Sequence, residues 1–308
     1  MTVSVLLPAY NAARYVPEAI ASVMAQTYKD WELVAIDDAS SDDTAHILEA
    51  WAAREPRIRV FRNEANRGMT GNWNRCLAEA RHELVIKLDA DDVLRPRALA
   101  VLTEAMHGDA IAAGVRTLMC DEQLEPFGAL PADEAMLRAG IDPYRDHDLP
   151  AARWWDVAAH GHQLWHSCAL LFRRSLVGGG WDERFGCASD TEVISRVLEQ
   201  DGVVAHRAYV GVWYRTVPDS VSGVFRRNDW LVWEGVAGNL LTLARVRKHR
   251  ELPRGLRIRY AYLWERWQKR SDALPPAIAA KLEDVVGGLE PPPAADRALW
   301  RVRKVIAG

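Results

Sequence analysis

The chain has 308 residues, 49% of them hydrophobic and 26% charged, which is ordinary for a soluble globular protein of one large domain or two. Its net charge of −3 argues against nucleic acid as a main partner, and its four widely separated cysteines predict reduced, buried thiols rather than a metal site. There is no signal-peptide pattern and no apolar stretch near the roughly 20 residues that span a bilayer, which predicts a cytoplasmic protein with at most peripheral membrane contact.

The first hundred residues alternate between strand and helix patterns. Strand-like runs occupy residues 3–7, 31–36, 58–61 and 84–88, and apolar residues at helical spacing predict helices over 16–26, 44–53, 71–80 and 97–106. This alternation predicts a parallel sheet with helices on both faces.

The pattern is looser after residue 110. The polar stretch 121–150 predicts loops and short helices that cover the sheet edge, 166–173 predicts a further strand, and 190–200 predicts an amphipathic helix. From about residue 225 the sequence predicts helices over 230–247, 256–270 and 297–306. These changes divide the chain into regions 1–110, 111–224 and 225–308.

An acidic cluster, Asp89-Ala90-Asp91-Asp92, follows the apolar run 84–88. Asp89 and Asp91 are two residues apart, so an extended backbone would point both to one side. Two convergent carboxylates repel each other unless a cation joins them, and a hard divalent cation with a diphosphate on its far side resolves that conflict. The alternative is a strand followed by an acidic turn, because aspartate is common in turns.

Three polar segments follow predicted strands of the sheet. They are Pro8 to Asn11, Asp37-Asp38 and the acidic cluster. Ligands of such sheets bind beyond the carboxyl ends of the strands. The three segments therefore predict one ligand site, which favours the cation hypothesis over the simple turn.

Taken together, these motifs resemble the family 2 glycosyltransferases with the GT-A fold. The matching segments are Val3-Ser4-Val5-Leu6-Leu7-Pro8-Ala9-Tyr10-Asn11, Ser22-Val23-Met24-Ala25-Gln26-Thr27-Tyr28, Trp31-Glu32-Leu33-Val34-Ala35-Ile36-Asp37-Asp38-Ala39-Ser40, Asn66-Arg67-Gly68 and Leu88-Asp89-Ala90-Asp91-Asp92, with a weaker continuation to about residue 224. The resemblance implies an α/β fold with a Rossmann-like, nucleotide-binding mixed sheet flanked by helices. Region 1–110 would bind the nucleotide sugar, 111–224 the acceptor, and 225–308 would be a helical extension.

The resemblance also assigns roles to residues. Pro8, Ala9, Tyr10 and Asn11 would lie under the nucleotide base, Asp38 would accept a hydrogen bond from it, and Arg67 would lie near base or diphosphate. Asp89 would meet the ribose and Asp91 the metal, with Asp89 and Ala90 also lining the donor site and Asp89 a second candidate ligand. The alternatives are a helix cap for Asp37-Asp38 and a surface arginine for Arg67; Asp92 would either face the acceptor or structure the turn.

The reaction implied is transfer of one sugar from a nucleotide sugar, most often UDP-linked in this family, to a hydroxyl with inversion. Mn²⁺ or Mg²⁺ would neutralise the leaving diphosphate, and a carboxylate must take the proton of the hydroxyl. Asp190 matches the family's base at the start of a helix; its alternative is an N-cap aspartate. The chain has Ser189 where the family more usually has glutamate, a departure from the pattern. Nucleotidyl transfer and a non-catalytic sugar- or nucleotide-binding scaffold are the competing functions.

Further features bear on the metal, the mode of synthesis and the acceptor. Val217 stands where the family often has a histidine, so His166 and His206 are the remaining histidine candidates for the metal. The Q-x-x-R-W signature of processive synthases is absent, which favours single-sugar addition.

Residues 244–270 hold ten Lys or Arg, two acidic residues and interleaved aromatics. This segment would either lie on an anionic membrane, where lipid-linked acceptors occur, or pack on the catalytic domain, the alternative that we favour.

Overall fold

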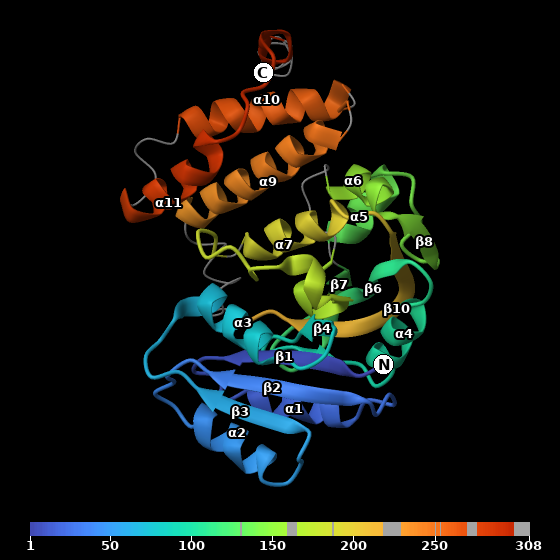
Figure 1. The fold of residues 1–308 in the computed structure, drawn as a ribbon, viewed down its shortest axis with the longest axis vertical. Helices are drawn as coiled ribbons and strands as arrows, with labels where there is room; N and C mark the ends of the chain where they lie inside the picture. The colour runs from blue at the N-terminus through green and yellow to red at the C-terminus, as the bar shows by residue number, and fades with distance from the viewer. Residues whose placement is uncertain are drawn as a thin grey trace.

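The computed structural model describes residues 1–129, 131–158, 165–186, 188–217, 229–249, 251–252, 254–269 and 276–298. Within them, ten strands form one sheet (Figure 1). The strands are β1 (Val3–Ala9), β2 (Trp31–Asp37), β3 (Ile58–Arg62), β4 (Leu84–Lys87), β5 (Val93–Leu94), β6 (Ala110–Cys120), β7 (Pro126–Ala129), β8 (His147–Pro150), β9 (Leu170–Arg173) and β10 (Val203–Arg215). Their order is β3-β2-β1-β4-β9-β6-β10-β5, with β7 paired to β6 and β8 to β10.

The first four strands form the parallel half of the sheet. β1 pairs in parallel with β2 and β4, and β2 with β3. The connecting helices are α1 (Val16–Met24), α2 (Thr44–Ala52) and α3 (Gly68–Glu79), and α4 (Ala98–Ala105) follows β5. The predicted bounds of these eight elements are confirmed to within three residues. All seven residues of β2 are buried, as expected for a strand covered on both faces.

The other half of the sheet mixes strand directions. β9 runs antiparallel to β4 and to β6, β10 runs parallel to β6, and β5 runs antiparallel to β10. The mixed sheet of the predicted fold is therefore confirmed, and the parallel pairing of the first half is interrupted at β9. The strand expected over 166–173 begins only at Leu170, after a 3₁₀ turn, η1 (Ser167–Ala169). The stretch 121–150 includes β7 and β8 as well as the expected helical segment, α5 (Pro131–Arg138).

Two hydrophobic clusters lie on opposite faces of the sheet. Along β1, Val5 and Leu7 belong to one cluster and Leu6 to the other, because successive side chains of a strand point to opposite faces. Trp73 of α3 joins the cluster of Leu6, whereas Ile20 of α1 joins that of Val5. Helices therefore cover both faces, with α1 and α2 on one side and α3 on the other (Figure 1).

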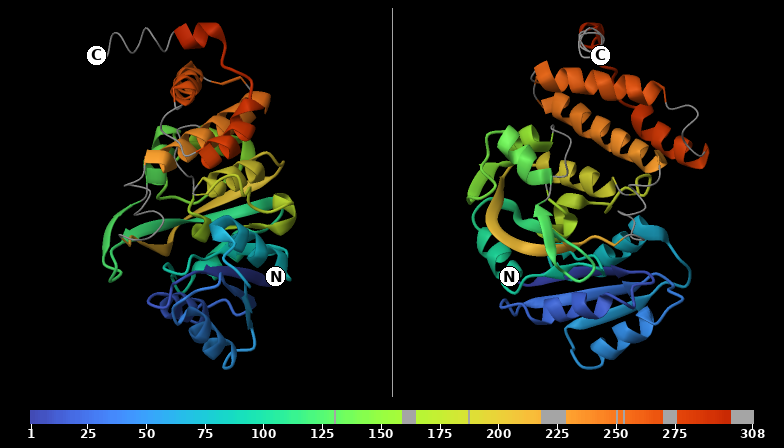
Figure 2. Two further views of the ribbon diagram at one scale, coloured as in Figure 1. Left: turned by 90° about the vertical axis from the view of Figure 1, so that its left-hand side faces the viewer. Right: turned by 180° about the vertical axis from the view of Figure 1, so that it is seen from behind.

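The remaining helices stack on the α3 side of the sheet. They are α6 (Ala151–Ala158), α7 (Ser189–Leu198), α9 (Asp229–His249), α10 (Arg254–Gln268) and α11 (Pro276–Gly287), with a 3₁₀ turn η2 (Arg174–Val177) before α7. Figures 1 and 2 show α9, α10 and α11 together at the end of the molecule remote from β3. The helices predicted over 190–200, 230–247 and 256–270 are confirmed, whereas α11 was not predicted. The helix predicted over 297–306 lies almost wholly outside the described residues.

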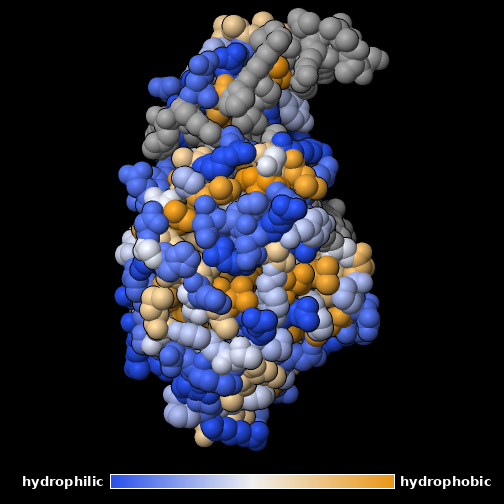
Figure 3. Space-filling model, turned by 90° about the vertical axis from the view of Figure 1, so that its right-hand side faces the viewer, coloured by the Kyte–Doolittle hydropathy of each residue, from blue (hydrophilic) through white to orange (hydrophobic). Residues whose placement is uncertain are grey.

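The aromatic residues of segment 244–270 pack inside the protein. Tyr260 is 1% and Trp267 0% exposed, and Tyr262 and Trp264 pack against the same hydrophobic cluster as α7. None of the described helices has both the length and the apolar character to cross a membrane. On the face in Figure 3, hydrophobic residues are scattered among hydrophilic ones. Packing thus accounts for the aromatics, and membrane contact through the basic residues stays a prediction.

Candidate active site

The ends of β1 and β2 are joined into one edge. The backbone N–H of Asp38 donates to the carbonyl of Ala9 over 2.8 Å, and the side-chain oxygen of Asn11 accepts from the N–H of Ser41 over 2.9 Å. Asn11 has a φ of +46°, a left-handed conformation that asparagine adopts more readily than most residues. The neighbouring Tyr10 is 54% exposed. The Tyr10 ring is therefore accessible to a ligand at this edge, as its predicted contact with a nucleotide base requires.

Asp38 organises the loop that carries Arg67. Its Oδ1 accepts from Asn63 Nδ2 at 2.5 Å and from the backbone N–H of Arg67 at 2.8 Å. The N-cap position of α2 belongs to Asp43, and the N–H of Thr44 donates to Asp42 Oδ1 at 3.0 Å, so Asp38 takes no part in this helix start. Asp38 is thus fixed next to the exposed Arg67, and the capping alternative for it is wrong.

Lys87 occupies the centre of the acidic site. Its Nζ lies 2.5 Å from Asp89 Oδ1, 4.0 Å from Asp190 Oδ2 and 3.9 Å from the centre of the Trp73 ring. Burial disfavours the charged ammonium, but the two carboxylates outweigh burial and raise the pKa of Lys87. Lys87 therefore remains a cation between two carboxylates that are far apart in the sequence.

The two remaining members of the acidic cluster differ in role. Burial first of all, and then the neighbouring Asp89, raise the pKa of Asp91 to about 6, so a bound cation would favour its ionised form. Asp92 is fully buried, and its Oδ1 accepts from the backbone N–H of Arg215 at 2.9 Å. Of the two alternatives for Asp92, structuring the turn is the one that its contacts support.

The oxygen ligands offered here suit Mg²⁺ or Mn²⁺. Among the described residues, no group of three His, Cys, Asp or Glu side chains is placed to hold a metal. Asp91, and the oxygen of Asp89 that Lys87 does not contact, are thus the candidate protein ligands, and further ligands would have to come from the diphosphate and water.

The two candidate histidines lie in different surroundings. His206 is 1% exposed, and its ring packs near Trp154 and Trp165 while Nε2 contacts the carbonyl of Pro143 at 3.0 Å, which is a structural role. The ring of His166 lies 4.0 Å from that of Tyr214. Burial lowers the pKa of His166 to about 4, against the opposing effect of Asp89, so its ring is neutral at pH 7. Of the two, only His166 is linked electrostatically to the acidic cluster.

Asp190 is held at the start of α7 by side chains of other elements. Its Oδ1 accepts from Trp181 Nε1 at 3.0 Å, while Oδ2 faces Lys87. The N-cap position belongs to Ala188 and has no side-chain capping bond, so the N-cap alternative for Asp190 is wrong. Burial raises the pKa of Asp190, and Lys87 opposes that effect. The carboxylate is therefore oriented toward the acidic cluster and is more basic than an exposed aspartate.

Glycine at position 180 permits the close contact that places Trp181. Asn74 bonds to both backbone groups of Trp181, through Oδ1 at 2.7 Å and Nδ2 at 2.9 Å. Gly180 has a φ of +78°, and a Cβ there would lie only 2.2 Å from Asn74 Oδ1. The Gly-Trp pair of the sequence is thus explained by the local geometry.

We expect Gly180→Ala to lower the free energy of unfolding by about 2 kcal/mol, because the backbone is left-handed and Asn74 must move. Turnover should fall as well, since Trp181 would no longer hold Asp190. Thermal unfolding and an activity assay check this. Gly178→Ala is the matched control, because its φ is not left-handed and a Cβ there meets no atom within 4 Å. Equal effects of the two substitutions would contradict the explanation.

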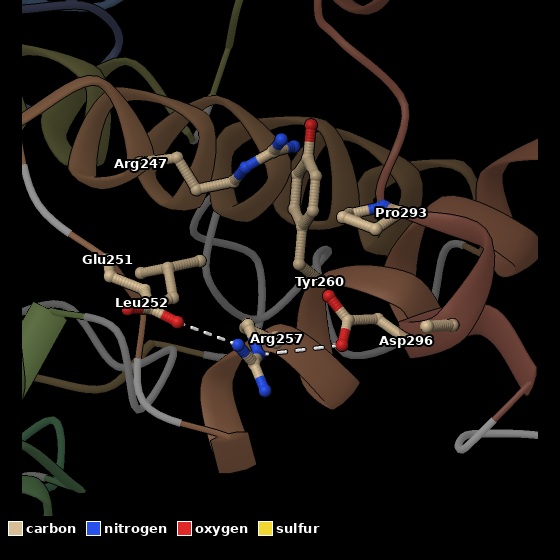
Figure 4. A pocket seen from close by; sticks show the side chains of 8 residues that line it. Arg247, Glu251, Leu252, Arg257, Tyr260, Pro293 and Asp296 are labelled. Atoms are coloured by element: carbon tan, nitrogen blue, oxygen red, sulfur yellow. Dashed lines mark hydrogen bonds and ion pairs between the residues drawn. The ribbon is translucent and has the colours of Figure 1, made fainter.

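A cavity of about 460 Å³ lies elsewhere, between α9, α10 and residues 291–296 (Figure 4). Three of its charged residues pair with one another: Arg257 lies 2.9 Å from Glu251 and 3.4 Å from Asp296. None of the residues considered for the site lines this cavity. The acidic cluster therefore remains the candidate active site.

The comparison with protein families agrees with this geometry. Residues 4–148 match the family model described as glycosyl transferase family 2. Residues 4–148 belong to that family. The match covers the ends of β1, β2 and β4, including the acidic cluster, so the chain carries a glycosyltransferase domain.

Curated relatives match this chain over different shares of its length. EpsE of Bacillus subtilis, a suspected glycosyltransferase by name, is 36% identical over 125 residues, 39% of this chain and 44% of its own length. The chondroitin synthase of Escherichia coli is 35% identical over 115 residues, 37% of this chain and 17% of its own. An uncharacterised protein of Sinorhizobium fredii, y4gI, is 31% identical over 234 residues, 74% of this chain and 24% of its own. The chain thus spans less than half the length of each of these relatives.

Solved structures extend the likeness of fold to nearly the whole chain. Staphylococcus aureus TarS, residues 1–349 in complex with UDP-GlcNAc, aligns with a TM-score of 0.64 and 16% identity, covering 93% of this chain and 80% of that 1–349 chain. The mannosyltransferase PcManGT of Pyrobaculum calidifontis, in complex with GDP-Man and Mn²⁺, aligns with a TM-score of 0.56 and 16% identity. The alignment covers 99% of this chain and 80% of the PcManGT chain. The GT-A fold expected of a family 2 glycosyltransferase is therefore confirmed.

Proposed function

We propose that this protein is a metal-dependent, inverting glycosyltransferase that moves a single sugar from a nucleotide sugar, a UDP sugar first of all, to a hydroxyl acceptor. One observation carries the proposal: Lys87 Nζ lies between Asp89, at 2.5 Å, and Asp190, at 4.0 Å. The candidate donor site and the candidate base therefore belong to one site. In this proposal region 1–110 binds the donor, 111–224 the acceptor, and 225–308 extends the fold.

The proposed reaction is a single displacement. The acceptor oxygen forms a bond to the anomeric carbon from the side opposite the diphosphate, whose bond to that carbon breaks, so the configuration inverts. Asp190 takes the proton of the attacking hydroxyl, because a neutral hydroxyl is a poor nucleophile at pH 7. Trp181 and Lys87 orient its two oxygens, and the N-terminus of α7 favours its ionised form.

On the donor side, the exposed ring of Tyr10 and the buried carboxylate of Asp38 are the proposed contacts of the base, with Arg67 beside them. Asp89 and Asp91 would face the ribose and diphosphate. When bound, Mn²⁺ or Mg²⁺ would supply positive charge that stabilises the departing diphosphate. The nucleotide sugars bound to TarS and PcManGT support a nucleotide-sugar donor. The acceptor would be a sugar, a lipid-linked sugar or another hydroxyl compound.

Donor hydrolysis tests the proposal. We expect slow release of nucleoside diphosphate from at least one of a panel of UDP, GDP and dTDP sugars, in Mn²⁺ or Mg²⁺ but not in EDTA. Asp91→Asn should lower this rate at least about 100-fold, because it removes the proposed metal carboxylate. The reaction should be measured as nucleotide release with and without metal.

The competing functions give other products. A nucleotidyltransferase would release or consume pyrophosphate, and a scaffold would bind nucleotide sugars without turnover. The absence of metal-dependent turnover with every donor in the panel would overturn the proposed function.

A further inference from the structure

Arg215, the last residue of β10, is a buried arginine beneath the acidic cluster. It is 3% exposed. Its Nε donates to the carbonyl oxygen of Asp91 at 2.8 Å, Nη1 donates to the carbonyl oxygen of Glu122, and Nη2 lies 2.5 Å from Glu18 Oε2. The guanidinium is thus bonded from three sides.

These partners come from three separate segments of the chain. Asp91 belongs to the acidic cluster, Glu18 to α1, and Glu122 follows β6. The guanidinium also lies 4.8 Å from the centre of the Tyr15 ring, at the start of α1. Arg215 therefore holds the acidic cluster in place relative to α1, the helix that follows the segment proposed to contact the nucleotide base.

Two bonds from this one residue fall on the acidic cluster. The Nε bond holds the carbonyl of Asp91, and the backbone N–H of Arg215 holds the side chain of Asp92 at 2.9 Å. A planar guanidinium donates in fixed directions, so it restricts the peptide plane after Asp91 more than a lysine could. The side-chain oxygens of Asp91 take no part in these bonds and stay available to a ligand.

We propose that Arg215 is a positioning residue of the donor site: it holds the main chain of Asp91 so that the carboxylate faces the metal and diphosphate. The inference rests on the proposed function. The contacts of Arg215 described above include neither Asp190 nor the residues proposed to contact the nucleotide base. Its loss should therefore weaken the part of nucleotide binding that depends on metal and leave the metal-free part unchanged.

Calorimetric titration with UDP and with GDP, each with Mn²⁺ and with EDTA, tests this. We expect Arg215→Lys to raise the Kd of the nucleotide in Mn²⁺ about tenfold, as for loss of one or two charge-assisted hydrogen bonds, and to leave the Kd in EDTA within about twofold. Arg14→Lys is the matched control, because Arg14 pairs with Glu122 at 2.8 Å and packs on Tyr15 but does not reach the acidic cluster.

A second variant separates positioning from general stability. In Arg215→Ala, guanidinium chloride on the order of 10 mM, far below denaturing concentrations, should restore Mn²⁺-dependent binding by filling the vacated site. If Arg215→Ala does not fold, Arg215→Lys decides alone. Equal loss of binding in Mn²⁺ and EDTA, or a lower Tm with unchanged Kd values, would overturn the inference. If the wild-type protein itself shows no effect of metal on nucleotide binding or turnover, the proposed function fails instead.

Discussion

Asp190→Asn is expected to reduce turnover about 100-fold or more while the affinity for donor nucleotide changes little. The substitution keeps the size of the side chain but removes its ability to accept a proton, and general-base catalysis typically contributes a factor of about 10² to 10⁴. The bond from Trp181 Nε1 can persist to the amide oxygen, whereas the attraction to Lys87 is lost. Steady-state kinetics with a donor and acceptor identified by the panel, together with calorimetric Kd values, measure the two effects separately.

The control is Asp201→Asn, the same substitution at an exposed position just after α7. It should leave both quantities unchanged. A normal kcat in Asp190→Asn would exclude Asp190 as the base. A raised KM for the donor with a normal kcat would assign Asp190 to donor binding instead.

The parallel half of the sheet could be predicted from sequence because its signals are local. Strands β1, β2 and β4 are mainly apolar runs, β3 places Arg59 between apolar residues, and the helices that follow them place apolar residues at helical spacing. The convergence of three strand ends then follows from topology alone. β6 and β10 were not predicted, since β6 is rich in alanine and glycine and β10 mixes polar and apolar residues across several irregularities in its pairing.

Lys87 and Arg215 show what sequence patterns could not supply. Lys87 interrupts an apolar strand, and that interruption was the available signal, because a buried lysine needs a counter-ion. Its partner Asp190 lies far along the chain, and only the fold brings the two together. Arg215 likewise reaches the acidic cluster from the end of an unpredicted strand. The motifs could therefore indicate the residues of the site but not the two buried cations that connect them.

Lys87→Met is expected to lower turnover at pH 7 about tenfold or more and to shift the acidic limb of the pH–rate profile to higher pH. Burial already raises the pKa of Asp190, and Lys87 is the charge that opposes this effect. Removing the ammonium disfavours the ionised carboxylate, so the pKa of Asp190 rises further and less of the base is ionised at a given pH. An opposite charge at about 4 Å typically shifts a carboxyl pKa by about 1 to 3 units, which sets the expected displacement.

The pH dependence distinguishes this effect from a loss of structure. Because the base is active when deprotonated, raising the pH should restore much of the turnover of Lys87→Met, whereas a damaged fold would stay inactive. Asp89 also loses its ion pair with Lys87 in this variant. We expect that loss to appear separately, as a raised KM for the donor. Lys281→Met, the same substitution on the exposed surface of α11, should leave the profile unchanged. A profile of Lys87→Met that falls uniformly at all pH values would show that Lys87 acts on the fold and not through the charge of Asp190.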